Sequence, residues 1–196
     1  MALDATDRDG GARRATLGEH QRAVGRGAWH AGPVELRIGH GIDVHRFSDD
    51  PARPLVLGGV RFEGETGLAG HSDADAVVHA AIDALLGAAG LGDIGMHFPD
   101  TDPTWSGADS ARLLAATLDQ VRADGWAVAN VDCTVVLERP KLAPRRDEMQ
   151  RRMTEMVGAP VSIKATRAEG LGAIGAAEGV VCTAVALLRR DEGQGR

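Results

Sequence analysis

The alternation of apolar and polar residues is regular enough to predict secondary structure only from Leu36 onward. Residues 37–43 alternate with the period of a strand, and residues 54–62 predict a second strand. The Gly58-Gly59 pair inside the second segment indicates a bulge or a bend, because glycine tolerates the backbone angles found at such points. The folded part of the chain is therefore expected to begin with β structure.

An apolar segment with helical spacing follows, and it predicts a helix from Ser72 to about Gly90. Ser72 is the expected N-cap, because its hydroxyl can accept a hydrogen bond from a free amide of the first turn. One face of this otherwise apolar helix carries a polar residue at every fourth position, namely Asp75, His79 and Asp83. The glycine-rich and acidic residues 92–107 predict a loop.

The second half of the chain alternates further strands and helices. Its patterns predict a helix over residues 108–123, a strand over 127–137, a helix introduced by Pro140 and Pro144 that ends near Val157, and strands over 161–166 and 180–188. The order β, β, α, α, β, α, β, β predicts an α+β fold, most simply a two-layer sandwich with the β-sheet backed by helices on one face. Residues 1–36 are expected to form a weakly structured N-terminal extension, residues 37–190 one domain, and residues 191–196 a C-terminal tail.

Composition narrows the possible partners. The chain has 196 residues, of which 43% are hydrophobic, and this is enough for one domain with a buried core. A net charge of −6 argues against nucleic acid or an anionic membrane as a partner, and residues 180–188, the longest apolar run, are too short to span a bilayer. The two cysteines, Cys133 and Cys182, indicate neither a disulfide framework nor a cysteine metal site, so a reducing, cytoplasmic location is expected.

One carboxylate and two imidazoles, Asp43, His45 and His79, are the candidate metal ligands. Asp43 and His45 are two residues apart in a predicted strand and so project to the same face. His79, one helical turn after Asp75, can reach them from a helix docked on the end of that strand. Three such donors with an open fourth position are the ligand set of a catalytic zinc. A lone Asp-x-His motif is more often an ordinary hydrogen-bonded pair beside a core histidine, and on spacing alone that alternative stays open.

Three other segments carry groups suited to a phosphorylated substrate. His71 and Ser72 precede the predicted helix, where free amides can hold a phosphate, although simple capping by Ser72 explains them equally well. Residues 93–95 and 98–102 can hold the hydroxyls of a polyol or serve only as turns. Residues 164–169 place a hydroxyl, a cation and a carboxylate at a strand end, where a diphosphate and Mg²⁺ can bind, or where the chain simply forms a solvated loop.

Several motifs in unbroken order together resemble the 2-C-methyl-D-erythritol 2,4-cyclodiphosphate synthase family. They are Gly39-His40-Gly41-Ile42-Asp43-Val44-His45, Gly70-His71-Ser72-Asp73-Ala74-Asp75, Leu91-Gly92-Asp93-Ile94-Gly95, Phe98-Pro99-Asp100-Thr101-Asp102-Pro103, Arg139-Pro140-Lys141, Lys164-Ala165-Thr166 and Glu178-Gly179. Each motif alone is weak, but their order over residues 36–190 is specific. The resemblance reverses the preference for a simple hydrogen-bonded pair and favours a metal site.

The resemblance implies a phosphorus–oxygen lyase of the non-mevalonate isoprenoid pathway. Its substrate is a small cytidine diphosphate compound, 4-diphosphocytidyl-2-C-methyl-D-erythritol 2-phosphate, which is cyclised with release of CMP, in a homotrimer with active sites between subunits. By this resemblance Zn²⁺ is bound by Asp43, His45 and His79, and Mg²⁺ or Mn²⁺ by Glu169, while His71 and Arg167 are catalytic. The implied substrate-binding residues are Asp43, Val44, His45, His71, Ser72, Asp93, Ile94, Gly95, Phe98, Pro99, Asp100, Thr101, Asp102, Pro140, Lys141, Leu142, Ala165, Thr166, Arg167 and Glu169.

The chain departs from the family at four positions. Arg167 stands where the family commonly has a threonine, and a guanidinium can donate to a phosphate more strongly than a hydroxyl. Gly170, Ala173 and Ala176 replace a lysine, an aromatic residue and an arginine, and the last two argue against an isoprenoid diphosphate at the trimer axis. Two rival functions are a zinc-dependent phosphohydrolase with Asp75 as general base, and a non-catalytic trimer whose metal has four protein ligands.

Overall fold

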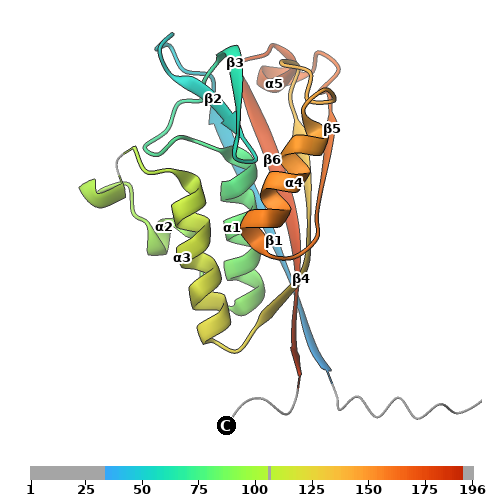
Figure 1. The fold of residues 1–196 in the computed structure, drawn as a ribbon. Helices are drawn as coiled ribbons and strands as arrows, with labels where there is room; N and C mark the ends of the chain where they lie inside the picture. The colour runs from blue at the N-terminus through green and yellow to red at the C-terminus, as the bar shows by residue number, and fades with distance from the viewer. Residues whose placement is uncertain (1–33, 106, 192–196) are drawn as a thin grey trace, which may run out of the picture. The chain divides into compact units, whose positions relative to one another are not determined.

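The computed structural model describes residues 34–105 and 107–191 (Figure 1). Four strands form a mixed sheet in the order β1-β6-β4-β5, in which only β4 and β5 are parallel. The mixed α+β class predicted from the sequence is confirmed. The elements in chain order are β1 (Val34–Arg46), β2 (Pro54–Leu57), β3 (Val60–Thr66), α1 (Ala76–Ala89), α2 (Ile94–His97), the 3-10 helix η1 (Pro103–Trp105), α3 (Ser110–Ala123), β4 (Ala127–Val136), α4 (Arg146–Val157), β5 (Val161–Thr166), α5 (Gly172–Gly175) and β6 (Gly179–Asp191).

The predicted N-terminal extension lies almost wholly outside the described residues. Its last three residues, 34–36, are the exception, because β1 begins at Val34 and pairs along its length with β6. In the described part of the chain no helix is long and apolar enough to cross a membrane.

The single strand predicted over residues 54–62 is wrong. Two strands, β2 and β3, form a separate antiparallel hairpin that turns at Gly58 and Gly59. These glycines have φ angles of +60° and +70°. A two-residue hairpin turn with positive φ at both positions favours glycine, which has no Cβ to clash there.

Ser72 is not the N-cap of the first helix, and that prediction is also wrong. Helix α1 begins at Ala76, and the carboxylate of Asp75 accepts hydrogen bonds from the amides of Val77 and Val78. The hydroxyl of Ser72 instead accepts from the Ala74 amide in the preceding loop, 3.2 Å away. The predicted loop over residues 92–107 also contains the short helices α2 and η1.

Helix α1 lies very close to β1 because β1 has two glycines on the face that meets it. A Cβ added to Gly39 would lie 2.0 Å from the carbonyl oxygen of Ala84, and one added to Gly41 would lie 2.1 Å from that of Ala80. No larger residue fits without moving the helix. This contact sets the distance between the end of β1 and the polar face of α1.

Helices pack on one face of the sheet and leave the other face exposed. Helix α1 packs on β1, β6 and β4, and α4 packs on β5 (Figure 1). The buried apolar core lies between these helices and the sheet. The other face leaves large apolar side chains of β1 and β6 exposed, namely Leu36, Ile38, Ile42, Val44 and Val185.

Candidate functional site

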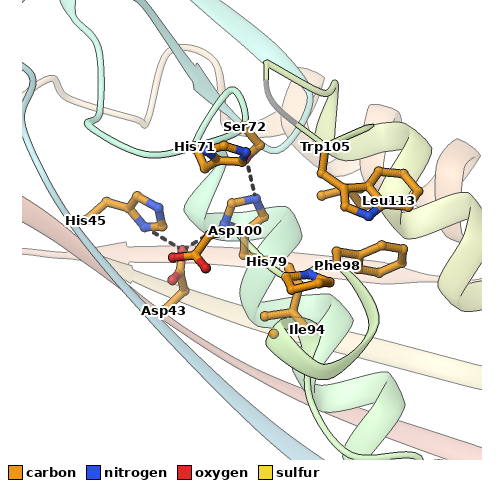
Figure 2. Close-up of a pocket in the computed structure, with 12 residues that line it drawn as sticks. Asp43, His45, His71, Ser72, His79, Ile94, Phe98, Asp100, Trp105 and Leu113 are labelled. Atoms are coloured by element: carbon orange, nitrogen blue, oxygen red, sulfur yellow. Dashed lines mark hydrogen bonds and ion pairs between the residues drawn. The ribbon is translucent and has the colours of Figure 1, made fainter. Parts of the chain in front are cut away.

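The three predicted metal ligands converge at the end of β1. Asp43 Oδ2 lies 2.8 Å from His45 Nδ1 and 3.3 Å from His79 Nδ1, and the three ligand atoms lie within 4.8 Å of one another. Figure 2 shows both imidazoles turned toward the carboxylate. The prediction that these side chains come together is confirmed.

The cluster has the unmet bonding capacity of a cation site. Within the described part of the chain, Asp43 Oδ2 and His45 Nδ1 are buried and neither makes a hydrogen bond, although the two atoms are close. Buried polar atoms are nearly always partnered, so two such atoms side by side indicate a shared third partner. Oxygen and imidazole nitrogen donors suit zinc, and the cluster has three ligands among the described residues, which leaves a coordination position open.

Electrostatics prepare the cluster for a cation. Burial acts to raise the pKa of Asp43, but the facing imidazoles of His45 and His79 outweigh it and lower the pKa to about 2. Burial acts to lower the pKa of His79, but Asp43 outweighs it and the pKa is raised. Asp43 is therefore ionised at neutral pH, and a cation that binds His79 Nδ1 must displace a proton below that raised pKa.

A pocket of about 390 Å³ opens beside the cluster. Its size suits a small organic ligand. One side carries His71, Ser72 and Asp100 with the metal ligands, and the other is apolar (Figure 2). The lining residues that the sequence predicted are Asp43, His45, His71, Ser72, His79, Ile94, Gly95, Phe98, Pro99 and Asp100.

Trp105 and Leu113 also line the pocket, and the sequence reasoning missed them. Trp105 packs edge-on against Phe98, with ring centroids 5.0 Å apart and planes at 82°. A tryptophan within a loop rich in Gly, Asp and Pro was the available signal. Leu113 gave none, because a leucine on an amphipathic helix is usually a core residue.

Other predicted substrate residues do not line this pocket. Asp93 accepts a hydrogen bond from the Met96 amide and Asp102 from the Thr104 amide, both within their own loop. Pro140 lines a separate small pocket. The remaining ones are the outward-facing Val44, the buried Leu142, and the exposed Thr101, Lys141, Ala165, Thr166, Arg167 and Glu169.

The carboxylate of Asp75 caps the helix N-terminus, and its contacts argue against the rival role of Asp75 as a general base. A phosphate at His71 and Ser72, which line the pocket, stays a prediction. Asp75 is 1% exposed. Its carboxylate accepts from the amides of Gly58 at 2.8 Å and Gly59 at 2.6 Å as well as from two amides of α1. Burial raises the pKa of Asp75, and these amides oppose the rise. Both carboxylate oxygens accept from backbone amides and the side chain is buried, so Asp75 joins the hairpin to the helix and is closed to solvent water.

Arg167 is engaged by a neighbouring carboxylate. Its guanidinium donates to Glu138 Oε2 at 2.8 Å, and Glu138 Oε1 accepts from the Gly170 amide at 3.3 Å. Arg167 lowers the pKa of Glu138. The positive charge of Arg167, which stands where the family commonly has a threonine, is thus partly neutralised by Glu138 of the same chain.

Comparison with known proteins agrees with the geometry. Residues 36–189 match the YgbB family. The chain is 52% identical over 159 residues to 2-C-methyl-D-erythritol 2,4-cyclodiphosphate synthase of Thermosynechococcus vestitus, which covers 80% of this chain and 98% of the relative.

Two solved structures are similar. One is a 2C-methyl-D-erythritol-2,4-cyclodiphosphate synthase described as the CDP-bound form, with a TM-score of 0.70 and 39% identity over 78% of this chain and 99% of that chain. The other is the bifunctional IspDF of Campylobacter jejuni, with a TM-score of 0.76 and 39% identity over 81% of this chain. This chain spans 43% of that bifunctional protein. The chain belongs to the YgbB family.

Proposed function

We propose that the protein converts 4-diphosphocytidyl-2-C-methyl-D-erythritol 2-phosphate to 2-C-methyl-D-erythritol 2,4-cyclodiphosphate and releases CMP. One observation carries the proposal: Asp43, His45 and His79 converge beside an open pocket in a chain of the YgbB family. A relative of 52% identity bears the name of this synthase. A cytoplasmic location stays a prediction.

The reaction joins two anionic groups of one molecule. An oxygen of the 2-phosphate forms a bond to the β-phosphorus, and the bond from that phosphorus to the bridging oxygen breaks, so that CMP leaves with the oxygen. The main obstacles are charge and orientation, which positioned residues and cations overcome without a protein nucleophile. Zn²⁺ held by Asp43, His45 and His79, with Mg²⁺ or Mn²⁺ at Glu169, would neutralise charge on the diphosphate.

The pocket residues favour cyclisation over hydrolysis. On the polar side, His71 and Ser72 can donate hydrogen bonds to the methylerythritol phosphate, and Asp100 can accept from a hydroxyl of the methylerythritol. The apolar wall offers no general base to activate a water molecule, and Asp75, the general base of the rival phosphohydrolase, is engaged by backbone amides. The apolar wall consists of Ile94, Phe98, Trp105 and Leu113.

A second copy of the chain would supply the nucleotide side of the site. Thr166, Arg167 and Glu169 are exposed and do not line the pocket of their own chain. Glu169 has a φ of +52°, a strained conformation for a non-glycine residue and one often found at functional sites. We propose a homotrimer that buries the apolar outer face of β1, because exposed apolar rows of this kind are typical of subunit interfaces.

The oligomer is tested by sedimentation of Ile42→Asp, which places a charge in the middle of that outer face. Ile42 is 55% exposed in the single chain, so the variant should fold. We expect a monomer that binds zinc and lacks activity. Arg151→Asp, an exposed change on α4 on the other side of the sheet, is the control and should sediment as the wild type. A trimeric Ile42→Asp variant would contradict the proposed interface.

The activity is tested by phosphorus NMR of the purified protein with the diphosphocytidyl substrate, Zn²⁺ and Mg²⁺. The expected products are CMP and a cyclic diphosphate. A linear phosphorylated product with CMP would favour the hydrolase. His79→Ala should fold but lose zinc and turnover, and a variant that keeps both would exclude His79 as a ligand.

A further inference from the structure

The imidazole of His79 has a polar neighbour at each of its nitrogens. Nδ1 faces Asp43, and Nε2 lies 2.8 Å from the hydroxyl of Ser110, the first residue of α3. The Ser110 hydroxyl in turn donates to Asp73 Oδ1, and the Ser110 amide donates to Asp73 Oδ2 at 3.0 Å. A relay of side chains therefore runs from the metal cluster to the start of α3.

We propose that Ser110 and Asp73 are positioning residues that hold His79 in its metal-binding tautomer and orientation. The proposal rests on the proposed metal site. The positioning residues act at Nε2 of His79, on the side of the ring away from Asp43, where Ser72 is the one residue that the sequence had predicted for the site.

The chemistry of the relay fixes its direction. An ionised carboxylate only accepts hydrogen bonds, so the Ser110 hydroxyl must give its hydrogen to Asp73. The lone pairs of that hydroxyl then accept from His79, which requires the hydrogen on Nε2. This tautomer leaves the lone pair of Nδ1 directed at the cluster. Ser72 Oγ, 3.2 Å from the same Nε2, can act as a second acceptor.

The relay is largely buried, with Asp73 half-buried, and it is held from several directions. Ser110 is 1% exposed, and both of its polar donors go to one carboxylate. Asp73 Oδ1 also accepts from the Asp75 amide at 3.2 Å, which ties the loop before α1 to the first turn of α3. Residues that hold the second nitrogen of a metal-binding histidine typically change metal affinity by about 10- to 100-fold when removed.

The test compares zinc affinities by competition with a chromophoric chelator. Ser110→Ala keeps the backbone bond to Asp73 and removes only the relay, so we expect zinc to bind about 10- to 100-fold more weakly. Ser110→Thr restores the hydroxyl and should bind nearly as tightly as the wild type. Thr117→Val is the matched control, because Thr117 lies two turns further along α3 with a buried hydroxyl that has no hydrogen-bond partner in the described structure.

Two results would overturn the relay: unchanged zinc affinity in Ser110→Ala, or an equal loss in Thr117→Val. Nitrogen NMR of His79 in the zinc-bound wild type needs no substitution and gives a second test. We expect a protonated Nε2 and a zinc-bound Nδ1, and the reverse would also overturn the relay. A wild-type chain that binds no zinc would refute the metal site itself, and this failure appears before any variant is made.

Discussion

A methyl group at residue 41 should disable the metal site from a distance. In Gly41→Ala the new Cβ would lie 2.1 Å from the Ala80 carbonyl oxygen and 2.7 Å from the Ala84 amide nitrogen. Both atoms belong to the backbone of α1, so no side chain can rotate out of the way. The helix must move away from β1, and it carries His79 with it.

The size of that movement follows from the contact. Ordinary van der Waals separation requires the Cβ and the carbonyl oxygen to part by about 1.3 Å. His79 Nδ1 and Asp43 Oδ2, now 3.3 Å apart, sit on the two elements that separate. Metal–ligand distances tolerate only about 0.2 Å, so the cluster loses a ligand even if the shift is partly absorbed elsewhere. Overpacking should also cost about 1–3 kcal/mol of unfolding free energy.

The assay is zinc competition together with urea unfolding of the zinc-free protein. We expect Gly41→Ala to remain folded and to bind zinc at least tenfold more weakly. Gly87→Ala is the control, because Gly87 lies in α1 and its nearest non-local atom, the His40 carbonyl oxygen, is 4.0 Å from an added Cβ. That variant should gain about 0.5–1 kcal/mol and keep its zinc affinity. Normal zinc binding by Gly41→Ala would refute the argument that the glycine contact sets the ligand spacing.

Three further predictions concern charge. Zinc affinity, measured by chelator competition over a pH series, should fall as the pH drops below the raised pKa of His79, by about tenfold per pH unit, because the ion displaces one proton. In the zinc-free chain, the contribution of His79 to the free energy of unfolding should change with pH in the opposite direction. This contribution is complete below the unfolded pKa of about 6.5 and is lost as the pH rises through the higher folded pKa. Urea unfolding at each pH measures it. Asp75→Ala should cost about 3–5 kcal/mol in urea unfolding, since four amides, three of them in buried bonds, lose their acceptor. The exposed N-cap variant Asp109→Ala should cost only about 1 kcal/mol, and equal losses would contradict the joining role of Asp75.

The ligand set was predictable because it depends on local periodicity. Asp43 and His45 share a face in any strand, whatever surrounds it. His79 needed one tertiary assumption, that its helix docks on that strand, and the glycines of β1 make this docking possible. The class of fold followed from the order of the elements in the same way.

The role of Asp75 was not predictable, because it depends on a contact between distant segments. Ser72 and Asp75 are both good N-cap residues, and local preference does not choose between them. The amides of Gly58 and Gly59, sixteen or more residues earlier, bind Asp75 and fix the helix start. Motif order likewise does not say which residues meet within one chain. It therefore did not show that the predicted substrate residues near Glu169 lie away from the pocket of their own chain.

Strand β1 links the proposed chemistry to the proposed assembly. Its odd-numbered residues from Gly39 to His45 face α1 and carry the metal ligands, while its even-numbered residues from Leu36 to Val44 face outward. A shift of one residue against β6 would exchange the two sets, so the register that turns the apolar row to the outer face also directs the carboxylate and imidazole into the pocket. A subunit docked on the outer face would therefore hold in place the strand whose other face binds the metal, while it brings the exposed Glu169 segment of one chain to the pocket of the next.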